Sequence, residues 1–156
     1  MVSEAAAQVL RQFDVGQGAL YPTRLTKSDK ETPIGEGWYC LNYGNAKETV
    51  IPDKPIGMLR TEAPGQLFFV LSAYRKDDDL TVSRAALGSP DIWVDPRLKH
   101  GFFTSGRLAR AIEEAKLKGF YLTRYGLAGA RCKELAPAAV DISGCTTLMT
   151  HAQVGN

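Results

Sequence analysis

The chain has 156 residues, of which 44% are hydrophobic and 23% charged, and its formal net charge is +2. This is the composition of a globular protein, and it argues against an intrinsically disordered chain. A net charge this small gives no reason by itself to expect a nucleic-acid or membrane surface.

The N-terminal third predicts a short helix followed by strands. Ser3 is a good N-cap for a helix from Glu4 to about Arg11, where alanines favour helix. After a turn at Gly16 and Gly18, Ala19–Leu25 is predicted as an edge strand, because Pro22 lacks a backbone donor. The polar stretch Thr26–Glu36 is predicted as a loop.

The middle of the chain predicts several more strands. Trp38–Tyr43 and Glu48–Ile51 flank the turn signal Gly44-Asn45 and are expected to pair as a hairpin. Pro52–Gly65, rich in proline and glycine, is expected to be an irregular connection of the kind that often binds partners. The apolar segment Gln66–Tyr74 predicts a central strand covered on both faces. Shorter strands are expected at Leu80–Ser83 and Asp91–Asp95.

The C-terminal third predicts the main helix. Ser105 caps a helix that runs to about Lys118, with Leu108, Ile112 and Ala115 on one face. Gly119 is expected to end it, and Phe120–Tyr125 to form a strand, whereas the last thirty or so residues show no clear period. The predicted fold is therefore α+β: a single domain over residues 1–156, mainly an antiparallel sheet with one main amphipathic helix (about 105–118) and a short N-terminal helix.

The pattern of reactive side chains predicts neither an enzyme nor a metal or cofactor site. His100, His151 and the three cysteines lack the spacings that bring metal ligands together. No nucleophile motif surrounds a serine or cysteine. Cys40 lies in an apolar strand pattern, which predicts a buried, inert thiol. Widely spaced cysteines, no signal-peptide pattern at the N-terminus and no run of 18 apolar residues predict a cytoplasmic location with no membrane contact.

Charge is unevenly distributed along the chain. Residues 97–134 contain nine Lys or Arg and three Glu. This basic region, with Arg107, Arg110 and Arg124, supports an alternative function as a small anion- or nucleotide-binding regulator or enzyme. Tyr121 and Tyr125 next to Arg124 are compatible with nucleic-acid contact, but strand alternation favours a core role for one such face, so no direct nucleic-acid binding is expected.

Carboxylates and tryptophan supply the candidate residues for binding a protein. Asp77, Asp78 and Asp79 form the densest acidic cluster, at an expected turn between strands, and Asp53 and Glu62 lie in the Pro52–Gly65 stretch. Acidic side chains at the rim of an interface speed association with a basic partner. Tryptophan is a common hot-spot residue in protein interfaces, so Trp93 is a further candidate contact if its ring reaches the surface. Trp38 could contact a partner on the same condition.

Three segments in order resemble one protein family. They are Gly37-Trp38-Tyr39-Cys40-Leu41-Asn42, Asp91-Ile92-Trp93-Val94-Asp95-Pro96-Arg97-Leu98, and Phe103–Leu108 continuing through Ala115–Phe120. Together they resemble the immunity-protein-eleven family of bacterial polymorphic toxin systems. The resemblance covers about residues 19–125 and is sharpest over Asp91–Phe120, whereas 126–156 is an extension that matches nothing in the family pattern.

The resemblance implies a cytoplasmic antitoxin that neutralises a cognate toxin, often a nuclease delivered by contact-dependent or type VI secretion. No catalytic residue is carried over, because the shared motifs are a helix cap, an amphipathic face and a glycine stop. We therefore expect this protein to occlude the active site of a DNase effector, and its acidic cluster to imitate the phosphates that such an enzyme binds. A nucleic-acid mimic that acts on many nucleases remains a further alternative.

Overall fold

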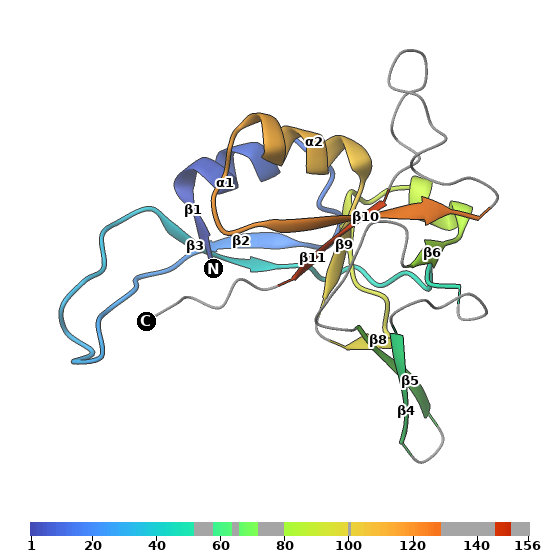
Figure 1. Ribbon diagram of the computed structural model, residues 1–156. Helices are drawn as coiled ribbons and strands as arrows, with labels where there is room; N and C mark the ends of the chain where they lie inside the picture. The colour runs from blue at the N-terminus through green and yellow to red at the C-terminus, as the bar shows by residue number, and fades with distance from the viewer. Residues whose placement is uncertain (52–57, 64–65, 72–79, 100, 129–145, 151–156) are drawn as a thin grey trace.

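The computed structural model describes residues 1–51, 58–63, 66–71, 80–99, 101–128 and 146–150. It confirms an α+β fold, with two α-helices and three small, mostly antiparallel sheets in the described part (Figure 1). In chain order the elements are β1 (Val2–Ser3), α1 (Glu4–Leu10), β2 (Ala19–Pro22), β3 (Trp38–Asn42), β4 (Met58–Ala63), β5 (Gln66–Leu71), β6 (Thr81–Val82), the 3-10 helix η1 (Arg84–Leu87), β7 (Ile92–Trp93), β8 (Leu98–Lys99), β9 (Phe102–Thr104), α2 (Gly106–Glu114), β10 (Tyr121–Leu127) and β11 (Thr146–Thr150).

The N-terminal sheet has the order β1-β3-β2, and it packs against the two helices on one side only. Leu20, Tyr39 and Leu41 point to the same core as Leu10 of α1 and Leu108 of α2. Figure 1 shows α1 and α2 side by side above the strands, and the two helices are in contact. Because side chains alternate along a strand, the opposite face of this sheet carries a separate set of side chains, of which Tyr21 and Cys40 are exposed.

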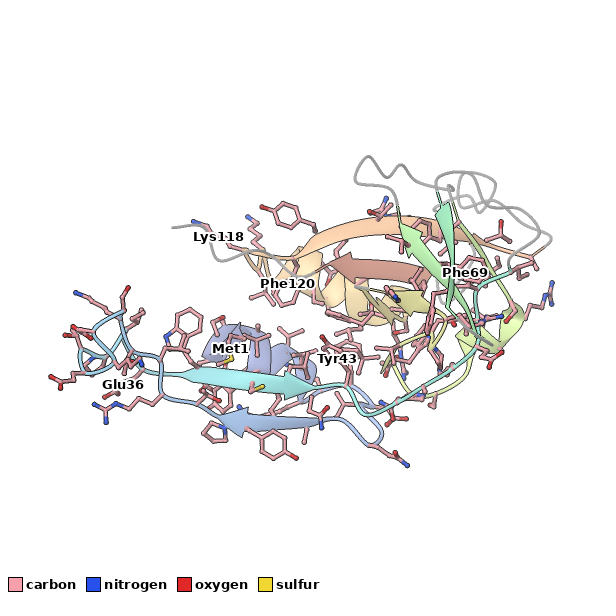
Figure 2. The ribbon with its side chains drawn as sticks, turned by 90° about the horizontal axis from the view of Figure 1, so that it is seen from below. Met1, Glu36, Tyr43, Phe69, Lys118 and Phe120 are labelled. Carbon is pink, nitrogen blue, oxygen red and sulfur yellow. The ribbon has the colours of Figure 1, made fainter. Side chains whose placement is uncertain are left out.

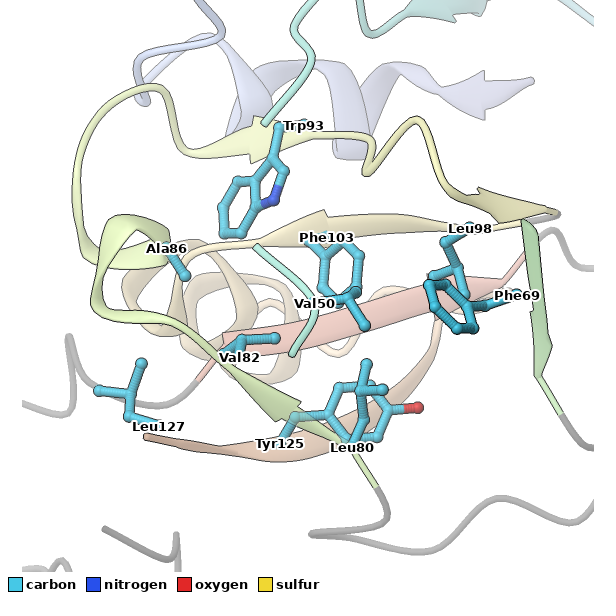
Figure 3. Close-up of a cluster of buried hydrophobic side chains, with 10 residues drawn as sticks. All are labelled: Val50, Phe69, Leu80, Val82, Ala86, Trp93, Leu98, Phe103, Tyr125 and Leu127. Carbon is cyan, nitrogen blue, oxygen red and sulfur yellow. The ribbon is translucent and has the colours of Figure 1, made fainter. Parts of the chain in front are cut away.

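A five-stranded sheet in the order β6-β10-β11-β9-β7 forms the centre of the molecule. Residues 46–51, here called the closing segment, pair with both of its edges, through the bridge of Ala46 to Val94 beside β7 and the bridge of Val50 to Val82 in β6. The backbone pairing therefore returns on itself, as in a small barrel. Figure 3 shows the apolar cluster that this arrangement encloses, with Phe103 near its centre and Trp93 stacked on it.

The third sheet, β4-β5-β8, extends from this core. β5 runs antiparallel to β4 and parallel to β8, and the amide of Phe69 donates to the carbonyl of Arg97 at 2.7 Å. Phe69 is buried in the core cluster. The central position predicted for the Gln66–Tyr74 strand is confirmed for Gln66–Leu71, whereas residues 72–74 lie outside the described part. Coverage of both faces is not borne out, because Phe68 and Val70, on the face opposite Phe69, are only half-buried.

Several predicted elements are confirmed. Both serine caps are present, since the Oγ atoms of Ser3 and Ser105 accept hydrogen bonds from the amides of Ala6 and Leu108. β2 is an edge strand, as Pro22 predicted. The amide of Thr23 donates to the Trp38 carbonyl. Because backbone groups alternate in direction along a strand, the nitrogen of Pro22 points away from β3, so its missing hydrogen costs no hydrogen bond between the strands.

Other predictions are wrong. Trp38–Asn42 does not pair with Glu48–Ile51, because β1 and β2 occupy both sides of β3 and the later segment closes the five-stranded sheet. Met58–Ala63 is a strand, where an irregular connection was expected. Long-range pairing decides both cases, and turn chemistry within one segment does not report it.

The end of the main helix also differs from the prediction. α2 ends at Glu114, and Ala115 is its C-cap, although Gly119 was expected to end it. Lys116 takes the left-handed conformation, with φ at 51°, and the amide of Leu117 donates to the carbonyl of Ile112. This is the usual geometry of a helix stop, formed here on a lysine one turn before the glycine. Ala115 is consequently exposed and does not belong to the buried face.

Candidate interaction surface

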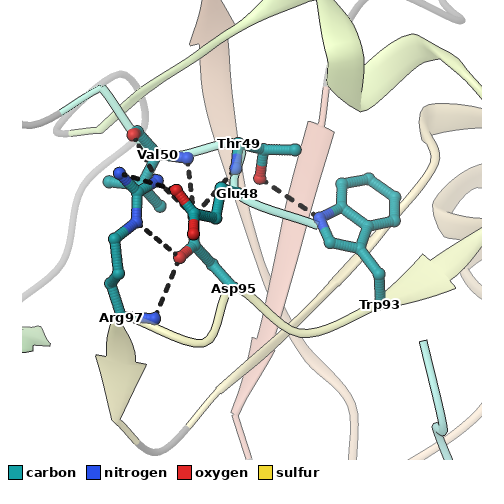
Figure 4. A network of polar contacts seen from close by, with 6 residues as sticks. All are labelled: Glu48, Thr49, Val50, Trp93, Asp95 and Arg97. Atoms are coloured by element: carbon teal, nitrogen blue, oxygen red, sulfur yellow. Dashed lines mark hydrogen bonds and ion pairs between the residues drawn. The ribbon is translucent and has the colours of Figure 1, made fainter. Parts of the chain in front are cut away.

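The Asp91–Leu98 segment holds the fold together from inside. Asp95 is buried, and its carboxylate accepts hydrogen bonds at 2.8 Å from the amides of both Thr49 and Val50 in the closing segment (Figure 4). Arg97 donates to the same carboxylate through its Nε and Nη2 atoms at 3.0 and 2.9 Å, and to the Val50 carbonyl at 2.8 Å. The indole Nε1 of Trp93 donates to Thr49 Oγ1. These groups fasten the closing segment to β7 and leave no lone pair of Asp95 aimed at solvent.

Asp91 makes a second buried junction, between the start of α2 and the turn that follows α1. Its carboxylate accepts two hydrogen bonds at 2.6 Å from Arg107, one at 2.6 Å from Ser105 Oγ and one at 2.9 Å from the amide of Asp14. Burial alone would raise the pKa of Asp91, but the hydrogen bonds from Arg107, Ser105 and Asp14 outweigh it and lower that pKa. The group is therefore a structural anion, and no proton-transfer role follows from it.

The basic region loses much of its apparent charge to these pairs. Arg97 and Arg107 are held by Asp95 and Asp91, and Arg124 contacts both carboxylate oxygens of Glu113 at 3.1 and 3.2 Å. Tyr125 is fully buried while Tyr121 is 68% exposed, so the two tyrosines do not form one binding face. The alternative function that relied on Arg107, Arg110 and Arg124 gains no site from this arrangement.

A different part of the described chain projects from the core. Residues 23–37, here called the arm, leave β2 and return to β3 as an irregular hairpin that extends away from the core (Figure 1). The amide of Ile34 donates to the carbonyl of Leu25, and that of Lys27 to the carbonyl of Thr32, both at 2.8 Å. Backbone pairing therefore orders the arm, although it packs on no second layer in the described part of the chain.

Both ends of the arm are fixed by specific contacts. At its tip Asp29 accepts hydrogen bonds from the amides of Glu31 and Thr32 and from the Thr32 hydroxyl, and these bonds lower the pKa of Asp29. At its base the indole Nε1 of Trp38 donates to the Ile34 carbonyl at 2.7 Å. Gly37 adopts φ 75°, and a Cβ there would lie 3.1 Å from the Cβ of Glu4 in α1, so glycine suits this position.

The arm joins the uncovered face of the N-terminal sheet, here called the outer face. Tyr21 and Cys40 are direct cross-strand partners, so their side chains share this face, and alternation adds Trp38. Tyr21 is 55% exposed, Cys40 is exposed and Trp38 is half-buried. Figure 2 shows β2 and β3 with the helices on one side, and Glu36 of the arm at the end of the molecule away from Phe69.

The structure places the predicted contact residues unevenly. Trp93 is fully buried, stacked on Phe103 with the ring centroids 5.7 Å apart, so the expectation that it contacts a partner is wrong. The ammonium group of Lys47 also lies over the Trp93 ring, 4.2 Å from the ring centroid. Glu62 lies in β4 opposite Leu67, with its side chain outside the described part. Asp53, Asp77, Asp78 and Asp79 lie outside the described residues.

Two further predictions concern reactive groups. The buried, inert thiol expected at Cys40 is wrong, because that side chain points to the outer face and is exposed. Within the described ranges no group of three or more His, Cys, Asp or Glu could hold a metal ion. His100, His151, Cys132 and Cys145 lie outside those ranges. None of the helices that the structure describes is long and apolar enough to cross a membrane.

The arm is the feature that sequence reasoning missed. Its polar composition predicted a loop, and the exposed Tyr21 and Ile34 were not among the candidate contacts. A signal was present, since Ser28-Asp29-Lys30 is a turn sequence and glycines at 35 and 37 mark the return to β3. Such signals report a turn, but whether a hairpin packs on a core or projects depends on distant residues.

Comparisons with protein-family models, with curated proteins and with solved structures find no match to this chain.

Proposed function

We propose that this protein is a cytoplasmic immunity protein. It binds a cognate antibacterial toxin, a nuclease effector of a type VI or related secretion system, and occludes the active site of that toxin. The proposal combines the resemblance of residues 19–125 with the chemistry of the described surface. The observation that carries it is the ordered arm beside the outer face, where aromatic and apolar side chains remain exposed on a fixed backbone.

Exposed aromatic side chains on a rigid surface favour protein binding. Tyr21 offers an exposed ring with a polar hydroxyl, a combination that is enriched in protein interfaces. Trp38 on the same face is half-buried, and its indole nitrogen is already bonded to the Ile34 carbonyl. The arm is already ordered by its own hydrogen bonds, so binding would require little additional loss of conformational freedom. The polar clusters around Asp91 and Asp95 make hydrogen bonds inside the protein.

Immunity is tested by co-expression with the protein encoded by the gene that adjoins this one. We expect that protein to stop growth when it is expressed alone, and growth to recover when this chain is present. The purified proteins should form a stoichiometric complex that suppresses cleavage of plasmid DNA. An unrelated nuclease should stay active in the same assay, because specific binding requires complementary surfaces.

Two results would reject immunity. One is persistent toxicity with no complex on size-exclusion chromatography when both proteins are soluble. The other is equal inhibition of every nuclease tested, which would indicate a general nucleic-acid mimic. The acidic cluster Asp77–Asp79 is a separate part of the proposal, and Asp77→Lys with Asp79→Lys should slow association if those carboxylates meet the basic site of the toxin.

A further inference from the structure

The tip of the arm contains Asp29 and Lys30, two adjacent residues of opposite charge, and Asp29 is held there by hydrogen bonds from Glu31 and Thr32. On either side of the tip, the outgoing half contains Arg24 and Lys27 and the return half contains Glu31 and Glu36, all four of them exposed. No ion pair within 4 Å joins these four side chains in the part of the chain that the structure describes. Apart from its tip, the arm therefore has a basic edge, with Arg24 and Lys27, and an acidic edge, with Glu31 and Glu36.

We propose that the arm, together with Tyr21 on the outer face, is the specificity-determining contact for a folded protein partner, and this rests on the proposed immunity function. The partner presents an uncharged depression that receives Tyr21 and Ile34. Acidic groups on one side of that depression face Arg24 and Lys27, and basic groups on the other side face Glu31 and Glu36. Charge complementarity of this divided kind selects a partner and fixes its orientation.

The charge pattern favours a protein over a nucleic acid. A phosphate backbone is attracted along its length by Lys and Arg, so Glu31 and Glu36 beside the basic edge would oppose its binding. The outer face carries the neutral side chains Tyr21, Trp38 and Cys40, which suit the uncharged centre of a protein interface. The charged edges of the arm then lie next to that centre, at the end where β2 and β3 join the arm.

The charge pattern of the arm can select a partner because the backbone that carries it is already ordered. Asp29 holds the tip and Trp38 holds the base, so the two charged edges keep their spacing before a partner arrives. Side-chain charges on a preordered backbone can discriminate between partners, because a mismatched partner cannot be accommodated by a change in the loop.

The test reverses each edge separately. One variant carries Arg24→Glu and Lys27→Glu, and the other carries Glu31→Lys and Glu36→Lys. The probe is the purified protein encoded by the adjoining gene, and association is measured by surface plasmon resonance at two salt concentrations. We expect each variant to bind about ten-fold or more weakly than the wild type. The variant Lys116→Glu with Lys118→Glu makes the same charge change as the first variant on exposed residues after α2, and it should bind within about two-fold of the wild type.

The two edge variants change the net charge in opposite directions, and this separates local contact from general attraction. If only net charge mattered, one variant would bind more tightly and the other more weakly, and that result would overturn the inference. Wild-type affinity in both variants would also overturn the inference.

Far-UV circular dichroism and the melting temperature identify any variant that has failed to fold, and Tyr21→Ser then serves as an uncharged second variant with the same expected loss of affinity. If the wild-type chain itself neither binds nor protects, the proposed function and this inference both fail; if it protects and the edge variants protect equally, only the inference fails.

Discussion

Asp91 and Asp95 belong to one short segment, and each is a buried carboxylate paired with an arginine, yet they join different parts of the molecule. Asp95 holds the closing segment through the amides of Thr49 and Val50. Asp91 holds the start of α2 through Ser105 and Arg107, and it reaches the turn after α1 through Asp14. One segment of sequence therefore connects the barrel-like centre to the helical layer.

The two junctions differ in whether water could replace the carboxylate as the partner of its arginine. The side chain of Arg107 is 57% exposed, so water could solvate it in place of Asp91. The side chain of Arg97 is only 25% exposed, and the Thr49 and Val50 amides are held inside the fold. Because unsatisfied buried donors are costly, we infer that the Asp95 junction contributes more to stability than the Asp91 junction.

The largest expected effect follows from removing the charge at Asp95. Asp95→Asn replaces an acceptor by an amide that cannot serve all its donors, and it leaves Arg97 with only the exposed Glu48, at 3.7 Å, as a counter-ion, so the free energy of unfolding should fall by about 3–5 kcal/mol. Asp91→Asn is the matched control and should cost about 1–3 kcal/mol, since Arg107 reaches water. Urea denaturation at neutral pH measures both. Equal losses would contradict the proposed difference between the junctions.

The same comparison can be sharpened by pH. Burial alone would raise the pKa of Asp95, but hydrogen bonds from Arg97 and the Val50 amide, with the charge of Arg97, lower it below its ordinary value. A carboxyl whose pKa is lowered by folding stabilises the protein above its unfolded pKa of about 3.9, and that contribution is lost as pH falls toward the folded value.

We therefore expect stability to fall as the pH is lowered below about 5. The difference between wild type and Asp95→Asn should narrow over that range, because protonation removes the charge that the substitution removes. Urea midpoints measured from pH 7 to pH 3 test this. A constant difference across the range would mean that Asp95 does not titrate with folding, and that its contribution is not that of a charged acceptor.

The sequence predicted local features well. Serines at 3 and 105, Pro22 at an edge and the apolar run of β5 each leave a signature within a few residues, and each is confirmed. Pairing between segments that are far apart in the chain leaves no such local signature. β11 is central in its sheet, yet the residues around Thr146–Thr150 have no strand period that stands out, and the closing segment was taken for half of a hairpin.

Functional residues were harder to predict for a related reason. Trp93 and Cys40 have similar apolar surroundings in the sequence, but one is the centre of the core and the other faces outward. The difference depends on which face of each sheet is covered, and that is decided by helices far away in the chain. Charge counts along the sequence also do not show that Arg97 and Arg107 pair with carboxylates that the pairing of distant segments buries.

A glycine next to the Asp91 junction tests how rigid that junction is. Gly16 has φ at 56°, and a Cβ there would lie 2.4 Å from Asn45 Oδ1, whose side chain also donates to the carbonyls of Val15 and Ile92. Gly16→Ala should therefore cost about 1–3 kcal/mol through backbone strain and displacement of Asn45.

Gly88→Ala is the control for this position. Gly88 has an ordinary φ of −78°, and its added Cβ would meet no atom closer than 3.7 Å, so the change should alter stability by about 0.5 kcal/mol or less. Melting temperatures of the two variants measure the contrast. Similar melting temperatures would mean that the turn after α1 adjusts freely, and the Asp91 junction would then be softer than its hydrogen bonds indicate.

The smallest expected effects separate the two helix caps. Ser105 Oγ accepts from the Leu108 amide at 3.2 Å and also donates to Asp91, whereas Ser3 Oγ accepts from the Ala6 amide at 3.4 Å on a partly exposed helix. Ser105→Ala should cost about 1–2 kcal/mol, and Ser3→Ala about 0.5 kcal/mol. In the double variant with Asp91→Ala, the loss from Ser105→Ala should shrink, because each change removes the same hydrogen bond between Ser105 and Asp91. Strict additivity in that cycle would show that Ser105 acts only as a cap, and that Asp91 binds the helix through Arg107 alone.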